Sequence, residues 1–125
     1  MNRTSFVSRY AMIIGALLLI EGVWELFSPV VFGILTSNTL HGVIHIVLGI
    51  AGLWSGWRGC GRGFAIFLGL LLIVVGICWF VPAGNELVVR FFNLNQAVAV
   101  VNLIVGAVSL LVALTSRRAA SLETS

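Results

Sequence analysis

The sequence predicts an all-α, polytopic membrane protein, a bundle of four transmembrane helices built from two similar helical hairpins. Of its 125 residues, 60% are hydrophobic and only 9% are charged, whereas soluble domains carry roughly 25% charged residues. The mean hydropathy is +1.15. The apolar residues gather in four runs, each long enough to cross a hydrocarbon core of roughly 30 Å as a helix. These observations exclude an ordinary soluble domain.

The first apolar run follows a short basic N-terminus and ends before Pro29. A signal peptide begins in the same way, but Glu21 and Glu25 interrupt this run, and no small-residue cleavage site precedes the proline. We therefore expect a retained transmembrane helix over about 10–28. After an apolar connector, Asn38 has the side chain of an N-cap, and it begins a second helix expected over about 38–57.

The third run, about 64–81, carries no charge and is followed by Pro82, which favours a helix end. Glu86 and Arg90 then stand four residues apart on a stretch with an apolar face. This pattern is typical of a short amphipathic helix with an i,i+4 ion pair at the membrane interface. We expect that helix over about 85–93.

The fourth helix is expected over about 95–115, followed by a polar, frayed tail, so that 1–125 forms a single membrane domain. Four crossings place both termini on one side of the membrane. One side then holds six arginines: Arg3, Arg9, Arg58, Arg62, Arg117 and Arg118. The other side holds only Arg90. The positive-inside rule therefore predicts that both termini are cytoplasmic.

The second and fourth helices show an internal repeat. A shift of 57 residues aligns Asn38 with Asn95, His45 with Asn102, and Gly49 with Gly106. The first and third helices each carry two glycines one heptad apart. We interpret the chain as a parallel repeat of two hairpins, related by a pseudo-axis along the membrane normal.

The glycine stripes on the helices favour close packing of the helix backbones, since lipid offers no hydrophobic driving force for association. Gly52 and Gly56 form a G-x-x-x-G motif on the second helix. The alternative for this motif is contact with a second copy of the chain, which would give a homo-oligomer.

One segment, N-x-x-H-x-x-x-H-x-x-x-G from Asn38 to Gly49, follows the apolar connector 32–35. With it the chain resembles a family of small bacterial four-helix integral membrane proteins, catalogued as a domain of unknown function. The resemblance covers most of the chain and is densest over 31–53. The chain departs from the family at Gly42 and Asn102, where members tend to carry Asn and His. The resemblance implies a four-helix fold and the bacterial inner membrane, but no activity.

Polar side chains gather in the predicted outer half of the bundle. At 1.5 Å of rise per residue, Glu25 and His41 lie about 5 Å below the outer face, and Glu21 and His45 about 10 Å. Adjacent antiparallel helices then set Glu25 level with His41, and Glu21 level with His45. Asn102 on the fourth helix falls at the depth of His45.

Three interpretations of this cluster remain open. Glu–His hydrogen bonds, together with the polar residues Asn38, Asn95 and Asn102, hold helices in register in many membrane proteins. Two glutamates and two histidines, each pair spaced i,i+4, also form a His2Glu2 set suited to zinc or another divalent ion. A buried Glu–His pair also exchanges a proton near neutral pH.

The leading functional expectation is a small, non-enzymatic membrane protein with a structural or accessory role. The alternative is a metal- or proton-handling protein that uses Glu21, Glu25, His41 and His45. We expect no catalytic residues, because the serines and Cys60 lie away from the histidines and the chain has no aspartate. No cofactor is expected unless a divalent metal is bound. The expected partner is the lipid bilayer rather than nucleic acid, because the arginines flank apolar runs and form no basic face.

Overall fold

The computed structural model describes residues 6–124, with side chains as far as 116. Five α-helices make up most of this part of the chain: α1 (Phe6–Phe27), α2 (Thr39–Trp57), α3 (Gly61–Trp79), α4 (Pro82–Phe92) and α5 (Gln96–Thr124). A two-stranded antiparallel sheet, β1 (Val30–Val31) and β2 (Leu35–Thr36), lies between α1 and α2. Four segments are long and apolar enough to cross a membrane: Phe6–Phe27, Thr39–Trp57, Gly61–Trp79 and Gln96–Ser116. The predicted all-helical class is confirmed.

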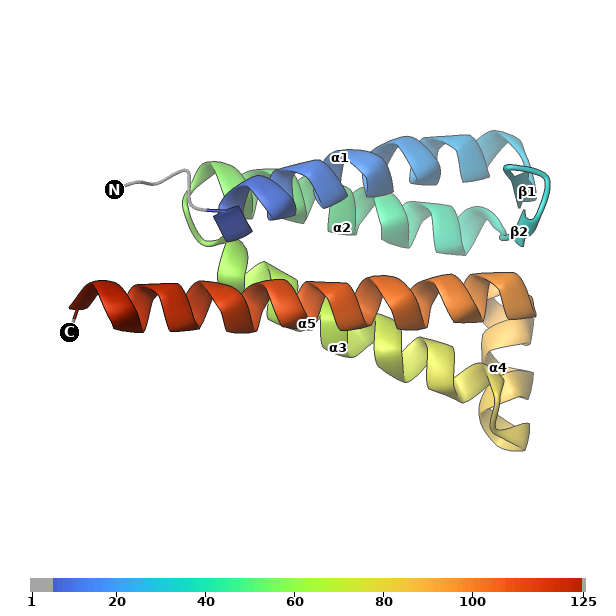
Figure 1. Ribbon diagram of the computed structural model, residues 1–125. Coiled ribbons are helices and arrows are strands. Elements are labelled where there is room, and N and C mark those ends of the chain that lie inside the picture. Colours follow the sequence, from blue (N-terminus) through green and yellow to red (C-terminus); the bar gives the residue numbers. More distant parts are fainter. Residues whose placement is uncertain (1–5, 125) are drawn as a thin grey trace.

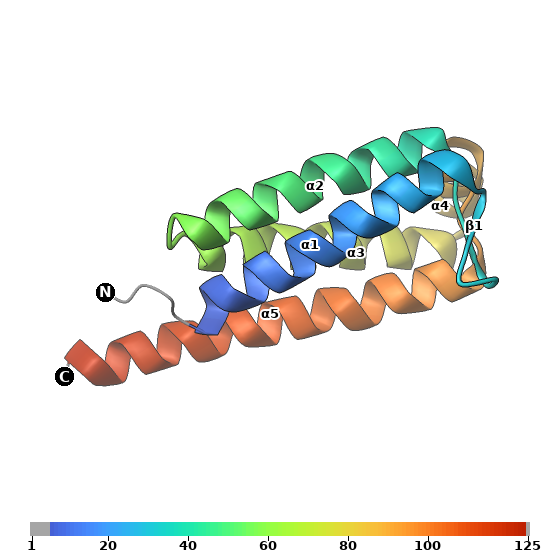
Figure 2. The same ribbon diagram turned by 90° about the horizontal axis from the view of Figure 1, so that it is seen from above.

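The helices associate chiefly as two antiparallel pairs, α1 with α2 and α3 with α5 (Figures 1 and 2). The short helix α4 crosses one end of the bundle, and the β1–β2 turn lies at that same end (Figure 1). The start of α1, the turn between α2 and α3, and the end of α5 lie at the opposite end. Every turn and connector is therefore confined to the two ends of the bundle.

The helix boundaries follow from local chemistry. Asn38 has an extended backbone, and its side-chain oxygen accepts a hydrogen bond from the His41 N–H at 2.9 Å, so the predicted N-cap is confirmed. Asn95 caps α5 in the same way, accepting from the Val98 N–H at 3.0 Å. Asn93, in the left-handed conformation with φ of 52°, ends α4.

Several boundaries differ from the predicted ones. The first helix starts at Phe6 rather than near residue 10, and α5 runs to Thr124 where a frayed tail was expected. Backbone hydrogen bonding needs no apolar side chain, and residues 116–124 contain neither glycine nor proline to stop a helix. The short helix begins at Pro82, where proline suits the first turn, rather than near residue 85.

Glycines bring the backbones of each helix pair into contact. A Cβ built on Gly49 would lie 2.6 Å from the Gly15 carbonyl oxygen across the α1–α2 interface. In the other pair, a Cβ on Gly106 would lie 2.9 Å from the Gly69 carbonyl oxygen. No side chain fits at such distances, so the predicted role of the glycines in close packing is confirmed.

The G-x-x-x-G motif is used inside the chain. A Cβ on Gly52 would lie 2.9 Å from the Ala11 carbonyl oxygen, and one on Gly56 would collide with the Ser8 carbonyl and Met12 of α1. The alternative in which this motif faces a second copy is therefore wrong for the folded chain, because α1 already covers both glycines.

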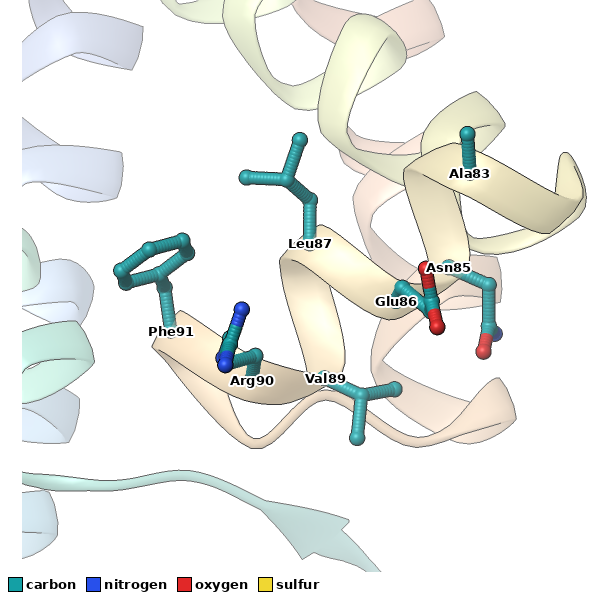
Figure 3. A pocket seen from close by; sticks show the side chains of 7 residues that line it. All are labelled: Ala83, Asn85, Glu86, Leu87, Val89, Arg90 and Phe91. Atoms are coloured by element: carbon teal, nitrogen blue, oxygen red, sulfur yellow. The ribbon is translucent and has the colours of Figure 1, made fainter.

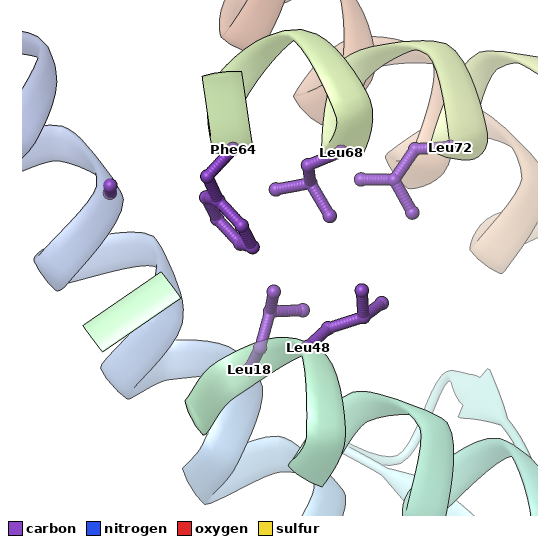
Figure 4. Packing of buried hydrophobic residues seen from close by; sticks show 6 residues of the cluster. Leu18, Leu48, Phe64, Leu68 and Leu72 are labelled. Atoms are coloured by element: carbon purple, nitrogen blue, oxygen red, sulfur yellow. The ribbon is translucent and has the colours of Figure 1, made fainter. Parts of the chain in front are cut away.

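The two helix pairs meet through a leucine-rich core. Leu18 of α1 and Leu48 of α2 face a row of side chains on α3 (Figure 4). That row consists of Phe64, Leu68 and Leu72, with Leu68 fully buried. Nearer the termini, the hydroxyls of Tyr10 and Ser109 join α1 to α5 at 2.6 Å. Apolar packing thus holds the pairs together along the middle of the bundle.

Hydrogen bonds also join the two connectors at the α4 end. The Asn38 side-chain amide donates to the Phe91 carbonyl at 2.8 Å, and the Asn95 amide donates to the Ile34 carbonyl at 2.8 Å. Each asparagine therefore caps its own helix and also reaches the connector of the other helix pair.

We predict that Gly49→Ala destabilises the protein by about 1–3 kcal/mol, because the added methyl must push α1 and α2 apart. Gly63→Ala is the matched control: it lies in α3 with open space around its position, and alanine is the better helix former. Thermal unfolding in detergent measures both. Equal melting temperatures for the two variants would contradict the packing argument.

Candidate functional site

The four predicted ionisable residues converge near the α4 end of the bundle. Glu21 and Glu25 lie one turn apart on α1, and His41 and His45 lie one turn apart on α2. Residues spaced by four share a helix face. Since the glycines press α1 and α2 together, these two faces meet.

One imidazole nitrogen faces both carboxylates. His45 Nδ1 lies 2.6 Å from Glu25 Oε1 and 3.2 Å from Glu21 Oε1. His41 Nδ1 lies 3.9 Å from Glu25 Oε2, and the two imidazole rings are 4.3 Å apart between centroids. His45 is therefore the residue through which the two glutamates are joined.

The centre of the cluster is shielded from solvent. Glu25 is 5% exposed, and His41 and His45 are each 6% exposed. Glu21 is more open, with 26% of its side chain accessible. Burying an ionised group costs free energy unless the group is paired. The contacts between Glu25 and the imidazoles therefore offset the cost of burying this carboxylate.

The predicted convergence is seen, and one of the two predicted pairs differs. Glu21 is level with His45 as expected and lies 3.2 Å from it. Glu25 is expected level with His41, whereas its shortest contact is to His45. Side chains on a helix tilt towards its N-terminus. On antiparallel helices this tilt carries Glu25 away from the α4 end and His45 towards it, so counting backbone rise alone places Glu25 one turn too far out.

Other polar residues complete the surroundings. Asn102 of α5 is buried and lines the same two hollows as His45, as its predicted depth requires. The buried Ser37 hydroxyl interacts with the Glu25 carboxylate. The Phe92 ring of α4 lies 5.7 Å from the His41 ring. Sequence reasoning missed Ser37 and Phe92, because no periodicity marks connector residues that fold back over a site.

Two carboxylates share one imidazole nitrogen in this cluster. His45 Nδ1 lies 2.6 Å from Glu25 Oε1 and 3.2 Å from Glu21 Oε1. Among the described residues, His41 Nδ1 is one of the buried side-chain atoms without a hydrogen-bond partner, whereas most buried polar atoms in proteins have one. A cation bound between the imidazole nitrogens and the carboxylates would give all of these groups a partner.

The donor set fits a small divalent ion. Glu25, His41 and His45 each offer one ligand atom, and these atoms lie within 4.8 Å of one another. Bonds of about 2.0–2.1 Å in tetrahedral geometry separate ligand atoms by about 3.3 Å. The Glu25 carboxylate lies near both imidazoles, with Oε1 2.6 Å from His45 Nδ1 and Oε2 3.9 Å from His41 Nδ1. Glu21 contacts His45 at 3.2 Å but is not part of this three-residue group.

Two hollows flank the cluster and share His45 and Asn102 in their walls. The larger, of about 320 Å³, is formed mainly by α1 and α5. The smaller, of about 90 Å³, lies between α2 and α3. The ionisable cluster is thus reached from the side of the bundle through the larger hollow, where Glu21 forms part of the wall.

A further hollow lies along α4, away from this cluster (Figure 3). All of its lining residues come from α4 itself: Ala83, Asn85, Glu86, Leu87, Val89, Arg90 and Phe91. Glu86 and Arg90 form no ion pair in the described part of the chain, so the predicted i,i+4 pair is wrong. A groove along one helix, without converging ligands, is a surface feature of that helix.

Comparisons of the chain with protein families, with characterised proteins and with solved structures find no match. The resemblance to small bacterial four-helix membrane proteins therefore stays a prediction.

We predict that His45→Ala destabilises the protein more than His41→Ala does. Removing His45 leaves two carboxylates without their shared donor, and breaking a buried ion pair costs about 3–5 kcal/mol. His41 lies 3.9 Å from the Glu25 carboxylate and otherwise packs against the His45 and Phe92 rings, so its loss leaves the shortest Glu–His contacts in place. The free energy of unfolding is measured in detergent, with chelator present so that only the contacts between the side chains contribute and no bound metal does. Equal losses in the two variants would contradict the central role of His45.

Proposed function

We propose that this chain is a small multi-pass protein of the bacterial inner membrane, with a non-enzymatic role that depends on a divalent metal ion. The membrane location is supported by the apolar surface. Each candidate spanning helix carries large apolar side chains that are more than half exposed, including Ile13, Val47, Leu70 and Leu111. Apolar surface on every side is a liability in water and the expected surface in lipid.

The distribution of arginines supports cytoplasmic termini. Arg9, Arg58 and Arg62 lie at the end of the bundle where α1 starts, and Arg90 lies on α4 at the opposite end. This asymmetry is the one that the positive-inside rule requires. The remaining basic residues of the prediction, Arg3 and the side chains of Arg117 and Arg118, fall outside the described part of the structure.

The two-hairpin repeat is supported by matching contacts. A shift of 57 carries α2 onto α5, and a shift of 54 carries α1 onto α3. Under these shifts, the Gly15–Gly49 contact becomes the Gly69–Gly106 contact, and Gly22–Ile46 becomes Gly76–Leu103. The shift of 57 also relates two hydrogen bonds, from Asn38 to residue 91 and from Asn95 to residue 34, because it maps 38 onto 95 and 34 onto 91. The three extra residues of the second connector belong to the segment that forms α4.

The metal proposal is carried by one observation: three buried ligand atoms within 4.8 Å, one of them a histidine nitrogen without a partner. Imidazole and carboxylate donors suit zinc among the common divalent ions. The ion replaces the proton on His45 Nδ1, neutralises the carboxylates and gives His41 a partner. The ion therefore supplies a positive charge beside the two carboxylates.

The other two interpretations have less support. Hydrogen bonds that only hold the helices in register leave His41 Nδ1 without a hydrogen-bond partner. A proton path needs ionisable groups through the membrane. The helix α3 carries no charged residue after Arg62, and α5 carries none between residues 96 and 115. The ligand set joins two helices, because Glu25 lies on α1 and both histidines lie on α2. A role in holding the fold, without an enzymatic activity, agrees with that arrangement. In this role the ion clamps α1 to α2.

We predict about one zinc ion per chain in protein purified without chelator. His45→Ala and Glu25→Gln lose the ion, and Glu86→Gln on the surface of α4 is the matched control that keeps it. Affinity falls as the pH is lowered, because protons compete for the imidazole ligands. Elemental analysis and melting temperatures with and without chelator measure these effects. Metal at background level, together with a melting temperature insensitive to chelator, would exclude the site.

We also predict that Cys60, exposed in the turn before α3, faces the cytoplasm. In a Cys78→Ser background, a membrane-impermeant maleimide labels Cys60 only after the cells are permeabilised. Phe32→Cys in a background without native cysteines is the opposite control, because Phe32 is exposed near the α4 end and is labelled in intact cells. The reverse labelling pattern would invert the topology.

A further inference from the structure

The larger hollow beside the cluster is built like a ligand site. Its volume of about 320 Å³ lies at the lower end of the range of about 300–1,000 Å³ for small-molecule sites. Its wall is mostly aliphatic, with Ile14, Leu17 and Ile20 from α1 and Val101 and Val105 from α5. An apolar trough of this kind holds the body of a small ligand, and the few polar groups in its wall decide which ligand.

The corresponding hollow on the other side of the bundle is smaller. Under the proposed repeat, the gap between α1 and α5 corresponds to the gap between α3 and α2, whose hollow measures only about 90 Å³. Phe92, from the connector that forms α4, lines that smaller hollow and packs against His41. Val75 lines it at the position equivalent to Glu21. The larger hollow therefore has both more space and a carboxylate in its wall, which the smaller one lacks.

The wall of the larger hollow favours a positive charge. Among the described residues that line it, Glu21 is the only acidic one, with 26% of its side chain accessible, and no arginine is among them. His45 lines it too, and its Nδ1 lies 3.2 Å from the Glu21 carboxylate. The rings of Trp24 and Phe32 meet edge to face there, with centroids 4.9 Å apart. Aromatic faces attract cations by about 0.5–2 kcal/mol, so the carboxylate and the two rings favour a cationic head group over an anionic one.

We propose that this hollow binds a lipophilic cation, an ammonium-type head on an apolar body. The head lies between Glu21 and the Trp24 and Phe32 rings, and the body lies along α1 and α5 towards Leu72. The proposal rests on the membrane location and the repeat, but not on the metal ion. His45 belongs to both sites, but the metal ligands Glu25 and His41 do not line this hollow, so a substitution at His41 separates the two sites.

The test is equilibrium binding to protein in phosphatidylcholine nanodiscs, with chelator present and empty nanodiscs subtracted. Three radiolabelled probes share a decyl chain and differ in the head group: trimethylammonium, sulfate or hydroxyl. We expect saturable binding of one trimethylammonium probe per chain and no saturable binding of the other two. Glu21→Gln should weaken binding at least tenfold, and Leu17→Trp should abolish it by filling the hollow.

Two controls separate this proposal from the metal site. Glu86→Gln removes a carboxylate elsewhere and should bind the probe normally. His41→Ala should lose zinc and still bind the probe. Leu17 is 55% exposed, so its variant keeps the buried cluster and remains informative if Glu21→Gln fails to fold. Equal binding of all three probes, or binding unchanged by Leu17→Trp, would show a crevice that only lipid fills and would overturn the proposal.

Discussion

Backbone contact between α1 and α2 is the constraint on which the candidate site depends. Gly42 lies between the two histidines in sequence, and a Cβ built on it would lie 3.0 Å from both the Gly22 carbonyl oxygen and the Cβ of Glu25. Any larger residue at position 42 would separate the helices at this level. The carboxylates and imidazoles meet because glycine leaves no side chain between them.

Under the proposed repeat, the candidate site is confined to one of the two helix pairs. The positions equivalent to Glu21, Glu25, His41 and His45 hold Val75, Trp79, Val98 and Asn102 in the second pair. None of these four side chains is ionisable, so the second pair has no counterpart of the Glu–His cluster at these positions.

Much of this arrangement can be predicted from the sequence, because it depends on helical geometry. The Asn38 cap and the meeting of two Glu and two His side chains follow from spacing alone. The pairing of Glu25 with His45 required the direction of each Cα–Cβ bond as well as backbone rise. The larger hollow was not predictable, since its size depends on where Phe32 and Phe92 of the two connectors lie beside the helices. Such long-range differences leave no periodic signal.

The hydrogen bonds that Asn38 and Asn95 each donate to the connector of the other helix pair have a consequence for biosynthesis. The acceptor for the Asn38 amide is the carbonyl of residue 91, which leaves the ribosome long after the first hairpin has done so. During synthesis from the N-terminus, the Asn38 amide therefore lacks this acceptor until α4 has been made. The loop between α1 and α2 gains its side-chain hydrogen bonds to the second half only after that half has been translated.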